Sequence, residues 1–199
     1  DSNLYHHMWH QPIGLVVPRK PTFLTRTDAS LNGMGGYCER LDHKWRLSRQ
    51  DLLDCGFPAG DQYLRQYEEI DIDPNLDHIN VYEFVALFIE LWICVRQLHE
   101  QIDHLPGGER SQNDDDNCTC LSWLRYAARS TRPAVRRLAR LLLGMLSHYY
   151  ISSILRTQGQ HLRGLDNIGA DLLSRFEKAP TWESAIAECP LLAPLRTCL

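Results

Sequence analysis

Residues 22–38 constrain the fold more than any other stretch, because they predict two adjacent strands joined by a tight turn. Residues 23–27 combine threonines with large apolar side chains, which suit a pleated surface. Asn32-Gly33 then supplies turn chemistry, and residues 34–38 are typical of a returning strand. The unit is therefore predicted to be a β-hairpin with one carboxylate, Asp28, at the end of its first strand.

The chain after the hairpin predicts one more strand, an irregular insertion and a long helix. Residues 43–47 alternate as a third antiparallel strand does, whereas residues 48–77 hold no period and predict an insertion with one helical turn near residues 62–67. Apolar side chains recur at helical spacing over residues 81–99, and Asn80 is the expected N-cap.

The second half predicts helices around one further strand. Helices are expected at residues 119–128 and 131–147, and residues 149–162 are β-prone at their start. A final core helix opens at Asp166 or Asn167 and runs to residue 176; a Pro-broken tail, residues 177–199, follows with one short helix at residues 182–188. This order predicts an α/β protein in which helices cover a mixed sheet.

Length and composition narrow the class of protein. The 199 residues suit one domain with a proper core, and no apolar run approaches the ~20 residues of a membrane span. Residues 1–21 form an extended, Pro-punctuated lead-in without a signal-peptide layout, and the missing initial Met indicates a piece of a longer chain. Seven cysteines in no zinc pattern favour free thiols and an intracellular, reducing location, cytoplasm or nucleus. No membrane partner is expected.

Four carboxylates follow or begin elements that are expected to converge: Asp28, Glu83, Asp116 and Asp171. Clustered carboxylates repel unless cations lie between them, and oxygen-only ligands suit Mg²⁺ or Mn²⁺. Two such ions stabilise the attacking and leaving oxygens of a phosphodiester. Taken singly, an aspartate in the position of Asp28 is usually only a turn residue, and Glu83 is explained equally well as a complement to the helix dipole.

Four motifs resemble the ribonuclease H domain of retrotransposon reverse transcriptases: Thr27-Asp28-Ala29-Ser30, Asn80-x-x-Glu83, Asp116-Asn117 and His161-x-x-Gly164-x-x-Asn167-x-x-Ala170-Asp171-x-x-Ser174-Arg175. The last is the most specific, with seven matching positions over fifteen residues. The resemblance covers residues 22–176 and is strongest to retroelements that encode a tyrosine recombinase. The lead-in resembles the segment that joins polymerase to nuclease.

This resemblance implies a ribonuclease H-like fold, a five-stranded mixed sheet flanked by helices. It implies cleavage of the RNA strand of RNA–DNA hybrids during reverse transcription, by a domain covalently linked to a polymerase in the parent polyprotein. Asp28, Glu83, Asp116 and Asp171 would hold two Mg²⁺ or Mn²⁺ ions. His161 matches a histidine that assists proton transfer or product release, or it simply ends a strand.

Arginines concentrate in the two helices predicted after residue 118: Arg125, Arg129, Arg132, Arg136, Arg137 and Arg140. A net charge of −4 argues against general nucleic-acid binding, so this local cluster is the candidate surface for a hybrid. We select Arg125, Arg129, Arg136 and Arg140, together with Asn117 beside the site, as hybrid-binding candidates. The alternative for each arginine is an ordinary solvated helix face.

One segment departs from the resemblance, which requires a buried central strand before Asp116 and beside the first strand. Residues 109–115 read Glu-Arg-Ser-Gln-Asn-Asp-Asp, and burying them carries a heavy desolvation cost. We expect a short, distorted strand, or an unusual register that uses Leu105 and its neighbours. Three functions therefore remain open: an active hybrid-specific nuclease; a weakened module that grips hybrid or braces the polymerase; and a DNA-cutting nuclease of the same fold, which the Ala-Asp-x-x-Ser-Arg ending disfavours.

Overall fold

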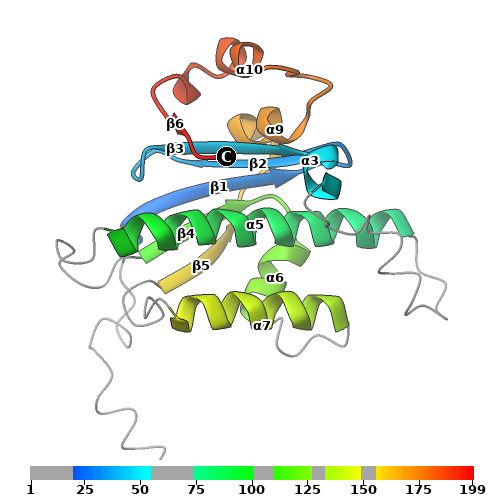
Figure 1. Ribbon diagram of the computed structural model, residues 1–199, viewed down its shortest axis with the longest axis vertical. Coiled ribbons are helices and arrows are strands. Elements are labelled where there is room, and N and C mark those ends of the chain that lie inside the picture. The colour runs from blue at the N-terminus through cyan, green and yellow to red at the C-terminus, as the bar shows by residue number, and fades with distance from the viewer. Residues whose placement is uncertain (1–19, 55–73, 101–109, 127–132, 149–155) are drawn as a thin grey trace, which may run out of the picture.

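A mixed sheet of six strands, in the order β5-β4-β1-β2-β3-β6, forms the frame of the protein (Figure 1). The computed structural model describes residues 20–54, 74–100, 110–126, 133–148 and 156–199. The strands are β1 (Phe23–Ala29), β2 (Gly33–Cys38), β3 (His43–Ser48), β4 (Arg110–Asp115), β5 (Arg156–His161) and β6 (Arg196–Thr197). The α/β prediction is confirmed. The predicted count of five strands is one short, because the two-residue β6 adds to the edge beside β3.

The predicted hairpin and third strand are confirmed. β1 pairs antiparallel with β2, which places Asp28 opposite Gly35, and β2 pairs antiparallel with β3 along its whole length. A side chain at position 35 has no room, because a Cβ there would lie 2.4 Å from the Cβ of Leu173. Glycine at this position therefore lets a helix from the end of the chain lie directly against the hairpin beside Asp28.

The polar segment before Asp116 is the central strand, so the prediction of a distorted or shifted strand is wrong. β4 pairs in parallel with β1, from Phe23 opposite Ser111 onward, and with β5 on its other side. Its polar groups are buried with partners: Thr25 Oγ1 donates to Asn113 Oδ1 at 2.6 Å, and Gln112 Nε2 donates to Asp114 Oδ1 at 2.8 Å. These hydrogen bonds offset the desolvation that the sequence alone leaves uncompensated.

Two substitutions in β4 are expected to differ sharply in their effect on folding. Asn113→Ala leaves the buried Thr25 hydroxyl without its acceptor and costs about 2–3 kcal/mol of the free energy of unfolding. Ser111→Ala removes a buried Oγ that has no hydrogen-bond partner among the described residues, and changes stability by less than about 0.5 kcal/mol. Urea unfolding of both variants measures the difference; equal losses would mean that the Thr25–Asn113 bond contributes little.

The helix α5 (Pro74–Glu100) begins earlier than predicted. Asn80 lies inside it and is not its N-cap, so that prediction is wrong. The insertion is also more regular than predicted, because it begins with α3 (Arg49–Asp54) and its last residues belong to α5. The two later helices are confirmed as α6 (Cys118–Tyr126) and α7 (Pro133–His148).

The described helices lie on both sides of the sheet (Figure 1). On one side α5 packs on β1 and β2, α6 packs on β5 and β4 beside it, and α7 lies against α5 and α6; these helices surround an apolar cluster that includes Phe23, Phe84, Leu91 and Val135. On the other side lie the 3₁₀ turn η3 (Gly164–Asp166), α9 (Ile168–Ser174), α10 (Trp182–Glu188) and the 3₁₀ turn η4 (Pro190–Leu192). This second layer holds the most specific sequence motif from Gly164 to Ser174, whereas the first residue of the motif, His161, ends β5.

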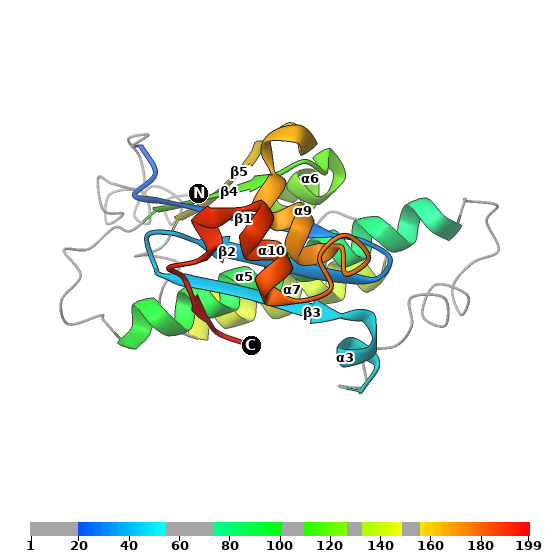
Figure 2. The same cartoon turned by 90° about the horizontal axis from the view of Figure 1, so that it is seen from above.

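The segment after α9 packs on the sheet (Figure 2). Lys44 Nζ, on β3, donates to the carbonyls of Leu192 and Leu195 at 2.8 and 2.6 Å. Arg46, also on β3, donates to the carbonyl of Ala179 at 2.8 Å and stacks 3.7 Å from the ring centroid of Phe176. The helix predicted at residues 182–188 is confirmed, and buried cations of the sheet anchor the segment that was predicted as a tail.

Several predictions fall outside the described residues: most of the lead-in (residues 1–19), the turn at residues 62–67, the start of the β-prone stretch (residues 149–155) and Arg129. The described strand of that stretch is its later part, β5, where the sequence pattern is weaker. In the described part of the chain, no helix combines the length and apolarity that crossing a membrane requires.

Candidate metal centre

Asp28 lies at the end of β1 and is 4% exposed. Its Oδ2 accepts a hydrogen bond from Ser174 Oγ, at the end of α9, and Ser30 Oγ in turn donates to the carbonyl of Ser174 at 2.8 Å. Burial raises the pKa of Asp28 to about 7, against the effect of the Ser174 hydrogen bond and with a further contribution from Asp116 and Asp171. A divalent cation beside Asp28 would offset the free-energy cost of burying its charged form.

Glu83 reaches the same place from α5. It is 4% exposed, and it accepts a hydrogen bond from the backbone N–H of Ala29, the residue after Asp28. Its Oε2 is buried and has no hydrogen-bond partner among the described residues. Burial, followed by the charges of Asp115 and Asp28, raises the pKa of Glu83 well above its ordinary value. A buried carboxylate oxygen without a donor is suited to a bound cation.

Asp116 follows β4 directly and is partly exposed. Burial and the charge of Asp171 raise its pKa, and the nearby His161 opposes that rise. Gly164 lies against it, since a Cβ at position 164 would be 2.8 Å from Asp116 Oδ2. The glycine of the sequence motif therefore leaves room for this carboxylate.

Asp28, Glu83 and Asp116 converge: each offers one oxygen, and these oxygens lie within 4.8 Å of one another. They come from β1, α5 and the end of β4, which are far apart in the sequence. Three hard oxygen ligands, one of them carrying a buried oxygen without a donor, fit Mg²⁺ or Mn²⁺. The residues present therefore suit a divalent cation.

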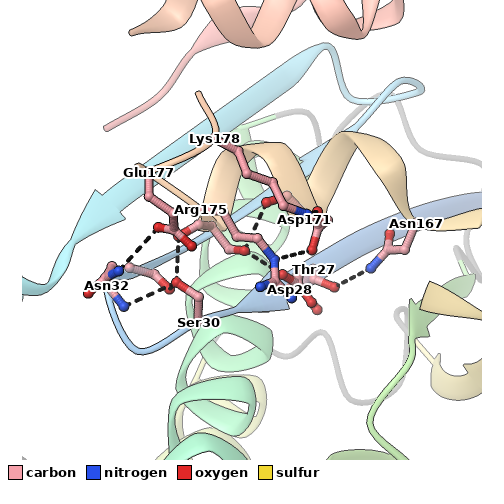
Figure 3. A network of polar contacts seen from close by, with 11 residues as sticks. Thr27, Asp28, Ser30, Asn32, Asn167, Asp171, Arg175, Glu177 and Lys178 are labelled. Carbon is pink, nitrogen blue, oxygen red and sulfur yellow. Dashed lines mark hydrogen bonds and ion pairs between the residues drawn. The ribbon is translucent and has the colours of Figure 1, made fainter. Parts of the chain in front are cut away.

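Asp171, the fourth predicted ligand, is near this triad but is engaged elsewhere (Figure 3). Arg175 Nε donates to its Oδ1, and Lys178 Nζ donates to its Oδ2 at 2.8 Å. Partial burial favours a raised pKa, but the hydrogen bonds from Lys178 and Arg175 outweigh it and lower the pKa of Asp171. The fourth carboxylate is thus neutralised by cations of its own chain.

Asp115 is a fifth carboxylate and was not among the predicted ligands. It is fully buried, and its Oδ1 accepts from the backbone N–H of Asn117 at 2.7 Å while Thr27 Oγ1 donates weakly to Oδ2 at 3.4 Å. Burial raises its pKa to about 7. Strand alternation turns Asp115 and Asp116 to opposite faces of the sheet, but the run of three aspartates does not reveal which one points where.

Asn117 has a structural role in addition to its place beside the site. Its Oδ1 accepts from the backbone N–H groups of Thr119 and Cys120 at 2.9 and 3.0 Å, which caps α6. Its Nδ2 donates to Asn80 Oδ1 at 2.8 Å and ties α6 to α5. Both polar groups of the Asn117 side chain, which was predicted to contact nucleic acid, therefore form hydrogen bonds within the protein.

His161 and Asn167 lie next to the triad, His161 near Asp116 and Asn167 next to the strand that carries Asp28. His161 ends β5 opposite Asp115 and is exposed, close enough to Asp116 to affect its pKa. Asn167 is in the N-cap position of α9, but its side chain makes no capping bond; its Nδ2 donates to the carbonyl of Thr27 at 2.9 Å. Asn167 thereby fixes α9 beside Asp28 (Figure 3).

Among the predicted hybrid-binding arginines, Arg136 and Arg140 are exposed on α7, as is Arg137. The described side chains do not include that of Arg125, although its backbone lies in α6, and Arg129 lies outside the described residues. The described part of the basic cluster is thus a solvent-facing stripe on the helix that lies beyond α5 from the sheet (Figure 1).

A second group of potential ligands, His43, Glu90 and Cys94, lies in the core. Glu90 accepts from Trp45 Nε1 at 2.6 Å and is 2.8 Å from His43 Nε2, and Cys94 Sγ donates to it at 3.5 Å. These groups satisfy one another directly, so the arrangement is that of a buried hydrogen-bonded network.

Comparisons with protein-family models, with curated proteins and with solved structures find no match to this chain.

Proposed function

We propose that this chain is a ribonuclease H-like nuclease that uses divalent cations to hydrolyse the RNA strand of RNA–DNA hybrids. The observation that carries the proposal is the convergence of Asp28, Glu83 and Asp116, with a buried oxygen of Glu83 left without a donor. The fold supports it as well, because the central strand β4 lies parallel to β1 and delivers Asp116 beside Asp28, as the sequence resemblance requires.

The protein's own groups prepare the site. Ser174 orients Asp28, the Ala29 N–H orients Glu83, and Gly164 leaves space for Asp116. Bound divalent ions would supply stabilisation of the charge on the attacking and leaving oxygens of the phosphodiester. We assign His161, exposed at the edge of the cluster, to proton transfer at its imidazole.

A second candidate, a module that binds hybrid but cleaves it weakly, is favoured by the engagement of Asp171 with Arg175 and Lys178. With that carboxylate occupied, the ligand set for a second ion is incomplete. The polar character of β4 no longer supports this candidate, since the strand is regularly paired on both sides.

The deciding experiment is cleavage of end-labelled substrates with Mn²⁺ and with Mg²⁺. We expect cuts in the RNA strand of the hybrid, abolished by EDTA, and no cuts in duplex RNA, duplex DNA or single strands. Hybrid binding without cleavage at saturating metal would favour the second candidate. Cleavage of duplex DNA in preference to hybrid would replace the proposal with a DNA-cutting nuclease.

Charge reversal on α7 is expected to weaken hybrid binding. A-form-like hybrids are held through their phosphates, and each lost phosphate contact reduces the slope of log K against log salt by about 0.9. The double variant Arg136→Glu/Arg140→Glu should therefore reduce that slope by about two. Fluorescence anisotropy from 50 to 300 mM salt, roughly the range over which counterion release is resolved, measures it.

The matched control is Arg40→Glu/Arg49→Glu, which makes the same change of charge at two exposed residues, one in the turn after β2 and one on α3. It should leave the slope within about 0.5 of the wild-type value. A control that lowers the slope as much as the α7 variant would show that net charge, rather than a binding surface on α7, is responsible.

A further inference from the structure

Asp171 differs from the other carboxylates of the site in having a cation on each oxygen. Arg175 Nε is bound to Oδ1 and Lys178 Nζ to Oδ2, the latter at 2.8 Å. The three carboxylates of the triad, Asp28, Glu83 and Asp116, have no ion pair among the described residues at salt-bridge distance. Among the described residues, the three triad carboxylates therefore have no salt bridge, whereas Asp171 has two.

The chain is built so that Lys178 returns to α9. After the helix ends, the backbone N–H groups of Lys178 and Ala179 both donate to the carbonyl of Arg175, at 3.1 and 3.0 Å, and close a tight turn. Ala179 is fully buried, and its carbonyl accepts from Arg46 on β3 at 2.8 Å. The sheet therefore fixes the turn that places the Lys178 side chain over Asp171 (Figure 3).

The two cations are held differently. The charge of Arg175, which is 40% exposed, acts on Asp28 as well as on Asp171, so two carboxylates of the site hold this cation. The Lys178 side chain is 52% exposed, and within the described residues it forms a salt bridge with Asp171 alone. An exposed ammonium on a flexible stem is a weak and replaceable partner, because water solvates it readily when it leaves.

We propose that Lys178 is an internal competitor for the second divalent cation: its ammonium group occupies Asp171 in the metal-free protein, so that the triad binds an ion first and Asp171 becomes a ligand only after Lys178 has left. The inference rests on the proposed metal centre. It makes the loading of the site ordered, and it sets the concentration of divalent cation at which the fourth carboxylate joins the site.

The test is binding of Mn²⁺ to the whole chain, followed by calorimetry and by the EPR signal of free Mn²⁺, with no enzymatic readout. We expect the wild type to bind one ion tightly and a second more weakly. Lys178→Ala and Lys178→Gln should tighten the second step by about two- to five-fold, the range that an exposed ion pair supports, and leave the first step unchanged. Lys178→Arg should retain the wild-type order.

The control is Arg196→Ala, which removes an exposed cation from its 2.7 Å pair with Asp42, on the opposite sheet edge from β5. It should leave both steps unchanged. A wild type that binds no Mn²⁺ would overturn the proposed metal centre itself. Two results would overturn only the competitor role: a wild type that binds one Mn²⁺ ion but no second ion, or a second step that is unaltered or weakened in both Lys178→Ala and Lys178→Gln.

Discussion

Asp28→Asn is expected to lower the rate of hybrid cleavage by more than about 10²-fold, since loss of a group that merely supports a metal ligand already costs 10–100-fold. The same variant should unfold at a higher temperature than the wild type in the absence of metal. The reason is the environment of Asp28: it is buried close to Asp116 and Asp171, and the neutral amide carries no charge for them to repel.

The gain in stability depends on pH. The pKa of Asp28 rises from 3.8 to about 7 on folding, so the folded state holds this proton more tightly than the unfolded state. The corresponding stabilisation is complete below the unfolded value and is lost as the pH rises through about 7. The metal-free wild type should therefore lose stability between pH 6 and pH 8, approximately the window around that pKa, and Asp28→Asn should lose less.

Thermal melting at both pH values, with and without Mn²⁺, measures these effects. Mn²⁺ should stabilise the wild type and have a smaller effect on the variant. Asp54→Asn, at an exposed aspartate on α3, is the control and should match the wild type throughout. Unchanged cleavage by Asp28→Asn at saturating metal would place the reaction centre elsewhere.

Glu90→Ala is expected to cost about 3–5 kcal/mol of the free energy of unfolding, the largest stability effect anticipated in this protein. Glu90, on α5, is fully buried. Its Oε2 accepts a hydrogen bond from Trp45 Nε1 at 2.6 Å, and its Oε1 lies 2.8 Å from His43 Nε2. Both partners are on β3 and are themselves fully buried. Removal of the carboxylate leaves a buried indole N–H and a buried imidazole without their acceptor.

The pair also has its own pH dependence. Burial lowers the pKa of His43, but the Glu90 charge and hydrogen bond outweigh it, and the net pKa is raised above 6.5. The stabilisation from this group is complete below pH 6.5 and is lost as the pH rises through the folded-state pKa. Glu90→Gln keeps an oxygen for Trp45 but removes the charge, so it should show less of this loss.

Asp28 and His43 shift stability in the same direction, so the Glu90 variants are best measured in the Asp28→Asn background. In that background, the difference between Glu90→Gln and the protein with Glu90, followed by urea unfolding at several pH values above about 6.5, reports on His43, because the raised carboxyl groups of Glu83, Asp115 and Asp116 are common to both proteins. A loss below about 1 kcal/mol for Glu90→Ala would mean that water replaces the carboxylate and that the network is dispensable.

The sequence alone was sufficient to predict two kinds of element: strands that pair with a neighbour in the chain, and helices with a continuous apolar face. The hairpin follows from residues 22–38, and α7 and α10 follow from helical spacing and turn chemistry. The triad residues were also found, because Thr27-Asp28-Ala29-Ser30, Asn80-x-x-Glu83 and Asp116-Asn117 are motifs in the sequence itself, although Glu83 lies inside α5 and not at its start.

Only the tertiary structure decided the features that depend on residues far apart in the sequence. β4 contradicts its composition because Thr25, on a strand 88 positions away, supplies the donor that Asn113 needs. Asn80 lies within α5, which begins at Pro74, and its side chain accepts a hydrogen bond from Asn117 at the N-cap position of α6 instead of capping α5. Asp171 was identified as a ligand, but its neutralisation by Lys178 arises from a turn that the sheet anchors through Arg46. Sequence periodicity records which face of an element is apolar, whereas the cost of burying a polar group is set by partners that only the folded chain brings within hydrogen-bond distance.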